Sequence, residues 1–321
     1  MSPYDLPLTA LSGTPPVHED LPPADGPAAL HPLAPADAGH GKAWAPRARQ
    51  VRLGSTVVRV ATSGEGPPLL LVNGIGGNIE MWEPVVRRIR DRQLIMFDAP
   101  GTGGSPALRR PRRLRSYATL VVRLLDELGL ERTDVLGYSW GGALAQELAH
   151  RAPERVGALV LAATMPGLGG QPPAPWVVAL MATPARYYSR TYLRIVAPVV
   201  FGSAPEQAAD SAHGDARLRK PPTMRGYAQQ IYAISSWSSR PFLRSLRAPT
   251  LVLAGAHDPL VPARNARILA REIPGARLQI VNGGHLFLLE QPDEGCRAVT
   301  EFLQQRGGRW ERGQPRARSA T

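Results

Sequence analysis

Short apolar runs alternate along the chain with longer segments in which apolar residues recur every three or four positions. The short runs are typical of buried strands, and the longer pattern is typical of helices with one apolar face. Strands are predicted near residues 57–61, 69–73, 94–98, 134–138, 158–162, 250–254 and 277–281. Helices are predicted near residues 81–91, 116–128, 141–151, 263–273 and 293–305. This alternation indicates an α/β fold with a mostly parallel sheet flanked by helices.

The alternation stops between residues 165 and 246, where aromatic residues are frequent and strand patterns are weak. We expect a helical cap insertion here, between a first part of the core (49–164) and a second part (247–306). The insertion should lie over the strand ends where a site would form. Its aromatics should mostly form the cap's own core, and some could line an apolar crevice: Trp176, Tyr187, Tyr188, Tyr192, Phe201, Tyr227, Tyr232, Trp237 and Phe242.

Both ends of the chain differ in composition from the middle. Residues 1–48 are rich in Pro, Ala and Asp and predict a disordered extension, and residues 307–321 predict a basic disordered tail. The first residues have neither a basic start nor an apolar stretch, and no apolar run reaches the roughly 18 residues that span a bilayer. We therefore expect a cytoplasmic protein without a signal peptide and without integral membrane association.

The formal net charge of +12 comes almost wholly from arginine, since Lys42 and Lys220 are the only lysines. Such basicity can attract nucleic acid, anionic lipid or a charged particle surface. No nucleic-acid-binding motif accompanies it, so no nucleic-acid partner is expected and a compositional bias is the simpler explanation. The arginines concentrate at Arg109, Arg110, Arg112, Arg113 and Arg115, and at Arg306, Arg309, Arg312, Arg316 and Arg318.

Candidate chemistry begins at Gly137–Gly142, which reads Gly-Tyr-Ser-Trp-Gly-Gly. The stretch follows an apolar run and opens a helical pattern, which is the context of a G-x-S-x-G nucleophile elbow. The glycines leave room for strand and helix to approach, and the turn lifts the hydroxyl of Ser139 out of the sheet. Ser139 is therefore the expected nucleophile, and an incidental glycine turn is the alternative.

A serine hydroxyl needs a base, and His285 is the best placed of the seven histidines. It follows the last predicted strand in the glycine-rich stretch Asn282–His285. His150 would lie more than two helical turns from Ser139, and His213 occupies a polar stretch that predicts a surface loop. Three others belong to the extension: His18, His31 and His40.

Asp258 is the expected partner of His285, because it follows the predicted strand 250–254 and gives the order Ser, Asp, His. The end of the preceding strand offers only Ala162, Ala163 and Thr164, and no carboxylate. A helix-capping role for Asp258 is the alternative, and His257 is interpreted as its solvated neighbour.

Acyl transfer also requires hydrogen-bond donors for the oxyanion. One should be the backbone N–H of Trp140, directly after the nucleophile. The other should come from the glycine-rich loop Asn73–Gly77 after the strand 69–73, most plausibly the N–H of Ile75. A second glycine-rich turn, Asp98–Ser105, lacks the ending of a phosphate loop and is interpreted as a structural turn. Metal-binding clusters are absent from the sequence, the lone Cys296 predicts no intramolecular disulfide, and no cofactor is expected.

Residues 50–305 resemble the alpha/beta-hydrolase superfamily, and more closely the intracellular poly(3-hydroxyalkanoate) depolymerases that act on medium-chain-length polyesters. The resemblance is carried by residues 73–76, 139–146, 159–164, 181–187, 249–255, 258–262 and 284–288. The Ser-Trp-Gly-Gly elbow and the Asn-Gly start of the oxyanion loop are its more specific parts. The resemblance implies catalytic roles for the same Ser139, Asp258 and His285.

The sequence thus predicts a cofactor-free serine esterase that cleaves a polyester or ester substrate, and the resemblance implies the surface of a storage granule as one place of action. Within enzymes, a small-molecule carboxylesterase, thioesterase, lactonase or cofactor-free perhydrolase on the same scaffold stays open. From another class, a non-catalytic granule- or partner-binding protein stays open. The serine at position 139 excludes dehalogenases and epoxide hydrolases that use an aspartate nucleophile. The sequence leaves the oligomeric state undetermined.

Overall fold

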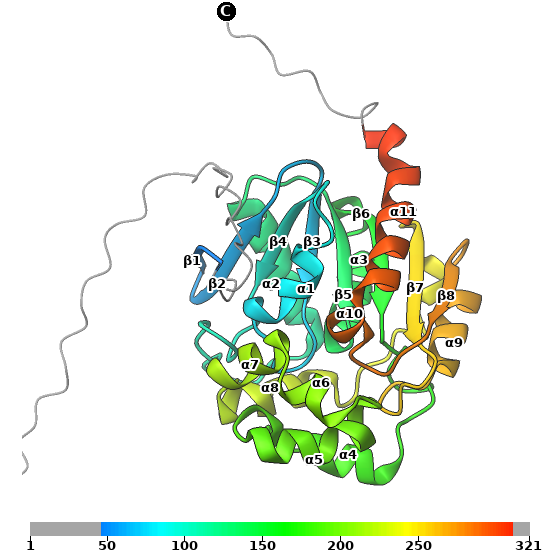
Figure 1. Cartoon of the computed structure of the whole chain (residues 1–321). Coiled ribbons are helices and arrows are strands. Elements are labelled where there is room, and N and C mark those ends of the chain that lie inside the picture. Colours follow the sequence, from blue (N-terminus) through cyan, green and yellow to red (C-terminus); the bar gives the residue numbers. More distant parts are fainter. Residues whose placement is uncertain (1–45, 311–321) are drawn as a thin grey trace, which may run out of the picture.

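The computed structural model describes residues 46–310, and the side chains of residues 46–305. Its centre is an eight-stranded sheet in the order β1-β2-β4-β3-β5-β6-β7-β8. The first two strands pair antiparallel with their neighbours, and all others are parallel (Figure 1). The strands are β1 Ala48–Leu53, β2 Thr56–Ser63, β3 Pro68–Val72, β4 Gln93–Phe97, β5 Thr133–Tyr138, β6 Val156–Ala162, β7 Thr250–Gly255 and β8 Arg277–Val281.

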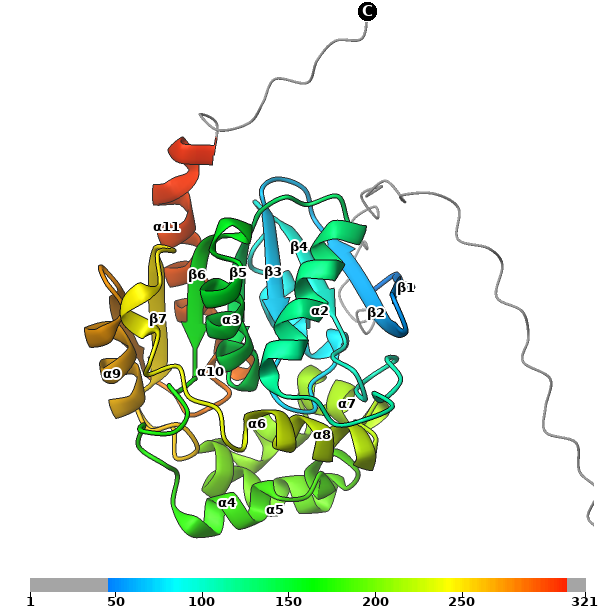
Figure 2. The same ribbon diagram turned by 180° about the vertical axis from the view of Figure 1, so that it is seen from behind.

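Helices cover both faces of the sheet. One face packs against α1 (Glu83–Val86), α10 (Phe287–Glu290) and α11 (Pro292–Trp310), which lie in front of the strands in Figure 1. The other packs against α2 (Leu114–Glu127), α3 (Trp140–Arg151) and α9 (Arg264–Glu272), which come to the front in Figure 2. This is the three-layer α/β arrangement that the sequence predicts.

The apolar runs form strands because successive side chains point to opposite faces and both faces are covered. In β3, Leu69 and Leu71 join the core on one face, whereas Leu70 and Val72 join the core on the other. Every residue of β5 and of β7 is buried. Both strands are also paired with a neighbour on each side. Their carboxyl ends, where the following turns begin, are therefore held in place by the sheet.

Between β6 and β7 the chain forms a layer of helices below the carboxyl ends of the parallel strands (Figures 1 and 2). These cap helices are α4 Pro175–Met181, α5 Arg190–Phe201, α6 Pro205–Ala209, α7 Ala212–Arg219 and α8 Met224–Ile234. Apolar residues of the cap, among them Leu193 and Val200, belong to the same buried cluster as Leu136 and Leu253 of the sheet. The cap and the sheet thus share a hydrophobic core.

Several elements differ from the sequence prediction. Strand β1 starts at Ala48, inside the predicted extension, and escaped prediction because most of its residues are exposed. The helix predicted over 81–91 is a 3-10 turn (Ile79–Trp82) followed by the single turn α1, since the chain must reverse to enter β4 at Gln93. Helix α11 continues to Trp310, past the predicted start of the tail at 307. The remaining calls on residues 1–45 and 311–321 lie outside the described residues.

His213 is the clearest local error of the sequence prediction. It is fully buried in α7 rather than exposed in a loop. The polar residues around it favour a helix start, because the Ser211 hydroxyl accepts a hydrogen bond from the Gly214 N–H and caps the helix. The same hydroxyl lies 2.8 Å from Nδ1 of His213, which satisfies the buried ring.

Candidate active site

Ser139 occupies the sharp turn between β5 and α3 and has φ 54° and ψ −118°. A positive φ is rare for a residue with a side chain and costs about 1–3 kcal/mol. The surroundings hold the turn in place. The Ser139 N–H donates to the Ala162 carbonyl (2.8 Å), and its carbonyl accepts from the Thr164 hydroxyl (2.8 Å). The turn leaves the Ser139 side chain half-exposed in a pocket rather than packed in the core.

The glycines beside Ser139 are required by close packing. A Cβ on Gly141 would lie 2.1 Å from the Val72 carbonyl oxygen, and one on Gly137 would lie 2.5 Å from the Gly141 carbonyl oxygen. Both distances are well inside van der Waals contact. Helix α3 can therefore approach β3 and β5 only because these positions lack a side chain.

His285 and Asp258 complete a linear hydrogen-bonded arrangement with Ser139. His285 Nε2 lies 3.1 Å from the Ser139 Oγ, and His285 Nδ1 lies 2.7 Å from an Asp258 carboxylate oxygen. The side chains of His285 and Asp258 are almost fully buried. Residues from the ends of β5, β7 and β8 thus meet although up to 146 positions separate them in the chain.

The backbone of His285 is fixed from two sides. Its N–H donates to the Phe201 carbonyl at the end of α5 (2.6 Å), and its carbonyl accepts from the Tyr138 hydroxyl (2.6 Å). The Phe201 ring also stacks on the imidazole at a centroid distance of 6.1 Å. The cap therefore helps to orient His285. Burial raises the pKa of Tyr138 well above its ordinary value, so its phenol stays protonated and can donate.

The loop Asn73–Gly77 lies against Ser139, as a Cβ on Gly74 would be 3.4 Å from the Ser139 Cβ. The Ile75–Gly76 peptide is held at both ends. The Tyr187 hydroxyl donates to the Ile75 carbonyl, and the Gly76 N–H donates to the Gln230 side-chain oxygen (2.8 Å). Within the described part of the chain, no acceptor pairs with the Ile75 N–H. That N–H is available to a ligand.

Trp140 is the first residue of α3, so its N–H has no acceptor within the helix. Its indole ring packs edge-on against Tyr117 (5.3 Å between centroids), and its Nε1–H donates to the Gln230 carbonyl (3.1 Å). The helix start and the loop carrying Ile75 therefore flank Ser139. This arrangement can offer two backbone donors to an oxyanion.

Gln230 is a site residue that sequence reasoning missed. It is fully buried in α8, its side chain binds the oxyanion loop, and its backbone binds the Trp140 ring. The neighbouring Gln229 bonds both the N–H and the carbonyl of Leu108 (3.1 and 2.8 Å). Two adjacent glutamines in an otherwise apolar helical stretch are the available signal, since buried amides require partners.

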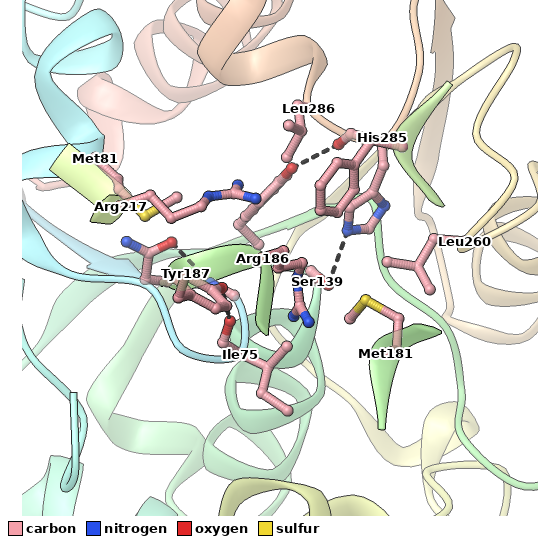
Figure 3. A pocket seen from close by; sticks show the side chains of 14 residues that line it. Ile75, Met81, Ser139, Met181, Arg186, Tyr187, Arg217, Leu260, His285 and Leu286 are labelled. Atoms are coloured by element: carbon pink, nitrogen blue, oxygen red, sulfur yellow. Dashed lines mark hydrogen bonds between the residues drawn. The ribbon is translucent and has the colours of Figure 1, made fainter. Parts of the chain in front are cut away.

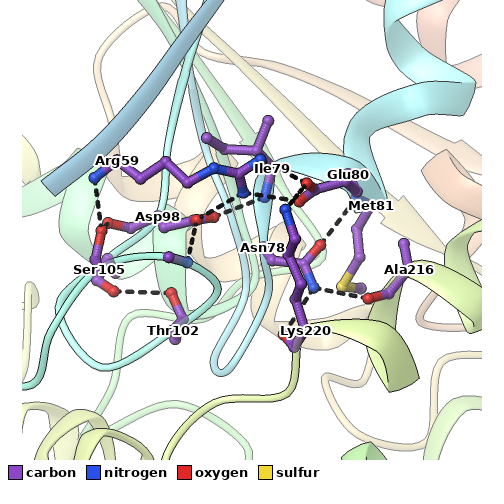
Figure 4. Close-up of polar contacts among 12 residues, drawn as sticks. Arg59, Asn78, Ile79, Glu80, Met81, Asp98, Thr102, Ser105, Ala216 and Lys220 are labelled. Atoms are coloured by element: carbon purple, nitrogen blue, oxygen red, sulfur yellow. Dashed lines mark hydrogen bonds and ion pairs between the residues drawn. The ribbon is translucent and has the colours of Figure 1, made fainter. Parts of the chain in front are cut away.

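A polar network anchors the far end of the same loop (Figure 4). Asp98 is fully buried and accepts hydrogen bonds from the Ile79 N–H (2.8 Å), the Gly104 N–H (2.8 Å) and Arg59 (3.0 Å). Arg59 also binds Glu80 through two hydrogen bonds. The turn Asp98–Ser105 thus has the structural setting that the sequence indicates.

The same network reaches the cap. Lys220 lies 2.6 Å from Glu80, and the Asn78 amide donates to the Ala216 carbonyl (2.9 Å) and the Lys220 carbonyl (3.0 Å). Burial alone would raise the pKa of Glu80, but Arg59 and then Lys220 lower it to about 2. The oxyanion loop is therefore connected to the cap at Ile75 and Gly76, and the segment after it is connected at Asn78 and Glu80.

The cap contributes part of the wall of the pocket above Ser139 (Figure 3). The empty space amounts to about 320 Å³, including the part that opens to solvent. Its wall combines apolar side chains, three aromatic rings and two buried arginines: Met81, Tyr138, Met181, Arg186, Tyr187, Phe201, Arg217, Leu260 and Leu286. The pocket can exclude water from a reacting ester.

Other candidate residues have different settings. His257 is exposed beside Asp258, and the His150 ring stacks on Phe242 at 4.1 Å, away from Ser139. Cys296 is buried in α11, and burial raises its pKa to about 12. Across the described residues, no group of His, Cys, Asp and Glu side chains forms a metal site, and no helix is long and apolar enough to cross a membrane.

Taken together, this sheet order and this site define a hydrolase of the α/β class. A family model for the alpha/beta hydrolase fold matches residues 67–292, and the chain belongs to that family. Among solved structures, the enol-lactonase from Burkholderia xenovorans superposes with a TM-score of 0.70 at 26% identity, covering 80% of this chain and all of that one.

Among curated relatives, a poly(3-hydroxyalkanoate) depolymerase from Ectopseudomonas oleovorans is 40% identical over 261 residues. The match covers 80% of this chain and 92% of the relative. The 3-oxoadipate enol-lactonase 2 of Acinetobacter baylyi is 29% identical over 250 residues, covering 76% and 91%. The resemblance to depolymerases expected from the sequence is thereby confirmed, and ester hydrolysis is the chemistry that these relatives support.

Proposed function

We propose that the protein is a serine esterase that hydrolyses poly(3-hydroxyalkanoate) with medium-length side chains to 3-hydroxy acids. The observation that carries the proposal is the hydrogen-bonded line from Ser139 Oγ through His285 to Asp258, with distances of 3.1 and 2.7 Å. The 40% identity to a poly(3-hydroxyalkanoate) depolymerase supports the polyester as substrate. Fold alone would not select any substrate.

In the proposed mechanism, the Ser139 Oγ attacks the ester carbonyl while His285 Nε2 takes the hydroxyl proton. Asp258 holds the imidazole in the tautomer that leaves Nε2 free to accept, and stabilises the imidazolium that forms. The N–H groups of Ile75 and Trp140 stabilise the oxyanion. His285 then protonates the leaving alkoxide, and water releases the acyl group through the same base.

The helical insertion 165–246 would control access in this scheme. Its aromatics Tyr187 and Phe201 line the pocket, whereas Tyr227 packs in the cap core. Because cap side chains form part of the pocket wall, the alkyl side chain of a bound ester would contact them directly. We expect the enzyme to act in the cytoplasm at the surface of polyester granules.

The same small pocket favours a second candidate function, the hydrolysis of small soluble esters or lactones. The likeness to enol-lactonases supports that candidate. A non-catalytic role would require Ser139 to be unreactive. Labelling with a fluorophosphonate probe tests this directly, because only an activated serine reacts.

The deciding experiment is hydrolysis of an amorphous medium-chain poly(3-hydroxyalkanoate) suspension, followed by turbidity and released hydroxy acids. We expect clearing by the wild type and a loss of at least about 10³-fold in Ser139→Ala. No clearing, with p-nitrophenyl esters still cleaved, would move the function to small esters. Near wild-type hydrolysis by Ser139→Ala would refute the mechanism.

A further inference from the structure

Two arginines are buried in the pocket wall beside Ser139. Arg186 is 1% exposed and Arg217 is 2% exposed. A buried guanidinium is costly unless hydrogen-bond acceptors or an opposite charge compensate it. The partners of each arginine therefore indicate whether its charge serves the fold or a ligand.

Arg186 is compensated at both of its terminal nitrogens, and only its Nε lacks a partner among the described residues. Its terminal nitrogens donate to the Thr183 carbonyl (3.0 Å) and to the Tyr227 hydroxyl (3.0 Å). Its guanidinium also lies over the Tyr187 ring at 4.8 Å. These contacts join α8 to the segment before α5, and they give Arg186 a structural role within the cap.

Arg217 lacks such compensation. Among the described residues, no acceptor pairs with its Nε or its buried Nη, and no carboxylate oxygen lies within 4.0 Å of its guanidinium. Aromatic faces surround it, with Phe201 at 5.0 Å and Tyr187 at 5.2 Å. The hydroxyl of Tyr187 is already bonded to Ile75.

Glu290 is the nearest candidate for a counter-charge, and its geometry does not fulfil that role. Its carboxylate is 3.8 Å from His213 Nε2 rather than in contact with Arg217. One of its oxygens is also buried without a hydrogen-bond partner among the described residues. Glu290 therefore leaves the donors of Arg217 without a hydrogen bond, although its charge favours the cation at longer range. Burial is the larger effect and lowers the pKa of this guanidinium from its ordinary value.

The position of Arg217 relates it to the reaction. The Phe201 ring that contacts its guanidinium stacks on His285, and the Tyr187 ring that contacts it bonds the oxyanion loop. The Phe201 ring thus separates the guanidinium from His285, and the Tyr187 ring separates it from the loop that carries Ile75. Figure 3 shows it directed into the pocket, on the side opposite Leu260.

We propose that Arg217 binds a free carboxylate of the substrate, so that the enzyme cleaves the ester bond next to the acid end of a 3-hydroxyacyl chain. The proposal rests on the esterase function above. A planar guanidinium fork matches a carboxylate, and pairing would compensate both charges inside the pocket. Each 3-hydroxyacyl chain carries such a carboxylate at one end.

The chemical step then has a defined leaving group. The Ser139 Oγ bonds to the acyl carbon, the acyl C–O bond breaks, and the terminal 3-hydroxy acid leaves with a proton from His285. Arg217 holds the carboxylate of that acid throughout. Water then bonds to the acyl carbon, Ser139 recovers its proton through His285, and the shortened chain presents a new free carboxylate.

The test compares the dimer of 3-hydroxyoctanoate as free acid with its methyl ester, in which an uncharged ester group replaces the carboxylate. Cleavage of the inner ester bond is followed by the release of its 3-hydroxy product. We expect the wild type to prefer the free acid in kcat/KM. In Arg217→Met the acid-to-ester ratio should fall by at least about tenfold, and Arg217→Lys should retain part of it. The control is Arg219→Met, which removes an exposed arginine of the same helix and should keep the wild-type ratio.

A second readout does not depend on turnover. Free 3-hydroxyoctanoate should protect Ser139 of the wild type from a fluorophosphonate probe, and protection should weaken about tenfold in Arg217→Met and less in Arg217→Lys. Equal kcat/KM for acid and methyl ester in the wild type, or equal protection by 3-hydroxyoctanoate and its methyl ester, would overturn the proposal. Failure to label Ser139 at all would instead refute the esterase function.

Discussion

Asp258 uses its two carboxylate oxygens for different tasks. One lies 2.7 Å from His285 Nδ1, and the other accepts the backbone N–H groups of Leu260 (2.9 Å) and Val261 (2.8 Å). The two bonds from the backbone close the turn after β7, and they orient the carboxylate toward the imidazole. Orienting the base and capping the turn are therefore combined in one residue.

Asp258→Asn separates these tasks. The amide oxygen can still accept from Leu260 and Val261, so the fold should be retained. The amide nitrogen facing His285 would impose the wrong imidazole tautomer, and kcat for ester hydrolysis should fall by about 10⁴-fold. Steady-state kinetics with a p-nitrophenyl ester, beside a thermal melt, measures both effects. An unchanged kcat would remove Asp258 from the mechanism.

Residues of the site differ in how far the sequence could predict them. Ser139, Asp258 and His285 each follow an apolar run at a strand end, so local pattern and chain order identify them. Arg217 and Gln230 lie in cap helices, and their significance depends on which partners the fold leaves around them. Missing partners are a tertiary property that no local pattern contains.

At the scale of elements, α8 connects the cap to two separate loops of the core. Its two buried glutamines point to different loops: Gln230 bonds the oxyanion loop at Gly76, and Gln229 bonds the loop at Leu108. A hydrogen bond to the Gly76 N–H fixes the plane of the Ile75–Gly76 peptide. The helix therefore holds the peptide that directly follows the Ile75 N–H, which is the proposed oxyanion donor.

Gln230→Met retains the volume of the side chain and removes the acceptor. We expect kcat to fall about tenfold with little change in KM, because oxyanion donors act mainly in the transition state. Gln229→Met is the matched control. It leaves the N–H and carbonyl of Leu108 unpaired and should lower the unfolding free energy by about 1–3 kcal/mol, as Gln230→Met should. Equal kcat values for the two variants would contradict a role for Gln230 in positioning the loop.

Predictability also varied between elements. The central strands were predicted within a few residues, since burial on both faces produces apolar runs. Strand β1 was missed because it is a largely exposed edge strand, with alternate residues at most facing the core. The helix after the oxyanion loop was predicted too long, because its apolar spacing carries no information about where β4 must begin.

At the scale of the whole molecule, the cap and the sheet are joined by apolar and polar contacts alike. Leu193 and Val200 of α5 share a core with Leu253 of β7, and Lys220 at the end of α7 pairs with Glu80. A change that destabilises α7 should therefore destabilise the protein as one cooperative unit. His213, buried in α7, offers a way to impose such a change by pH alone.

Burial, with a smaller contribution from Arg217, lowers the pKa of His213 from 6.5 to about 3. Between these pH values the unfolded chain binds a proton that the folded protein excludes. The unfolding free energy is therefore unaffected by His213 above about pH 6.5. Below that pH it decreases as the pH falls, by up to about 1.4 kcal/mol per pH unit. Glu80, with a pKa of about 2, adds a loss of the same sign only below about pH 4.5.

Urea denaturation at about pH 7.5, 6 and 5 measures this dependence in a range where Glu80 does not contribute. We expect the unfolding free energy of the wild type to decrease across the range, and that of His213→Gln to decrease less steeply because its side chain cannot take up a proton. His257→Gln alters an exposed imidazole and should follow the wild type. Parallel curves for the wild type and His213→Gln would mean that His213 is protonated in the folded protein, with Glu290 at 3.8 Å as its counter-charge.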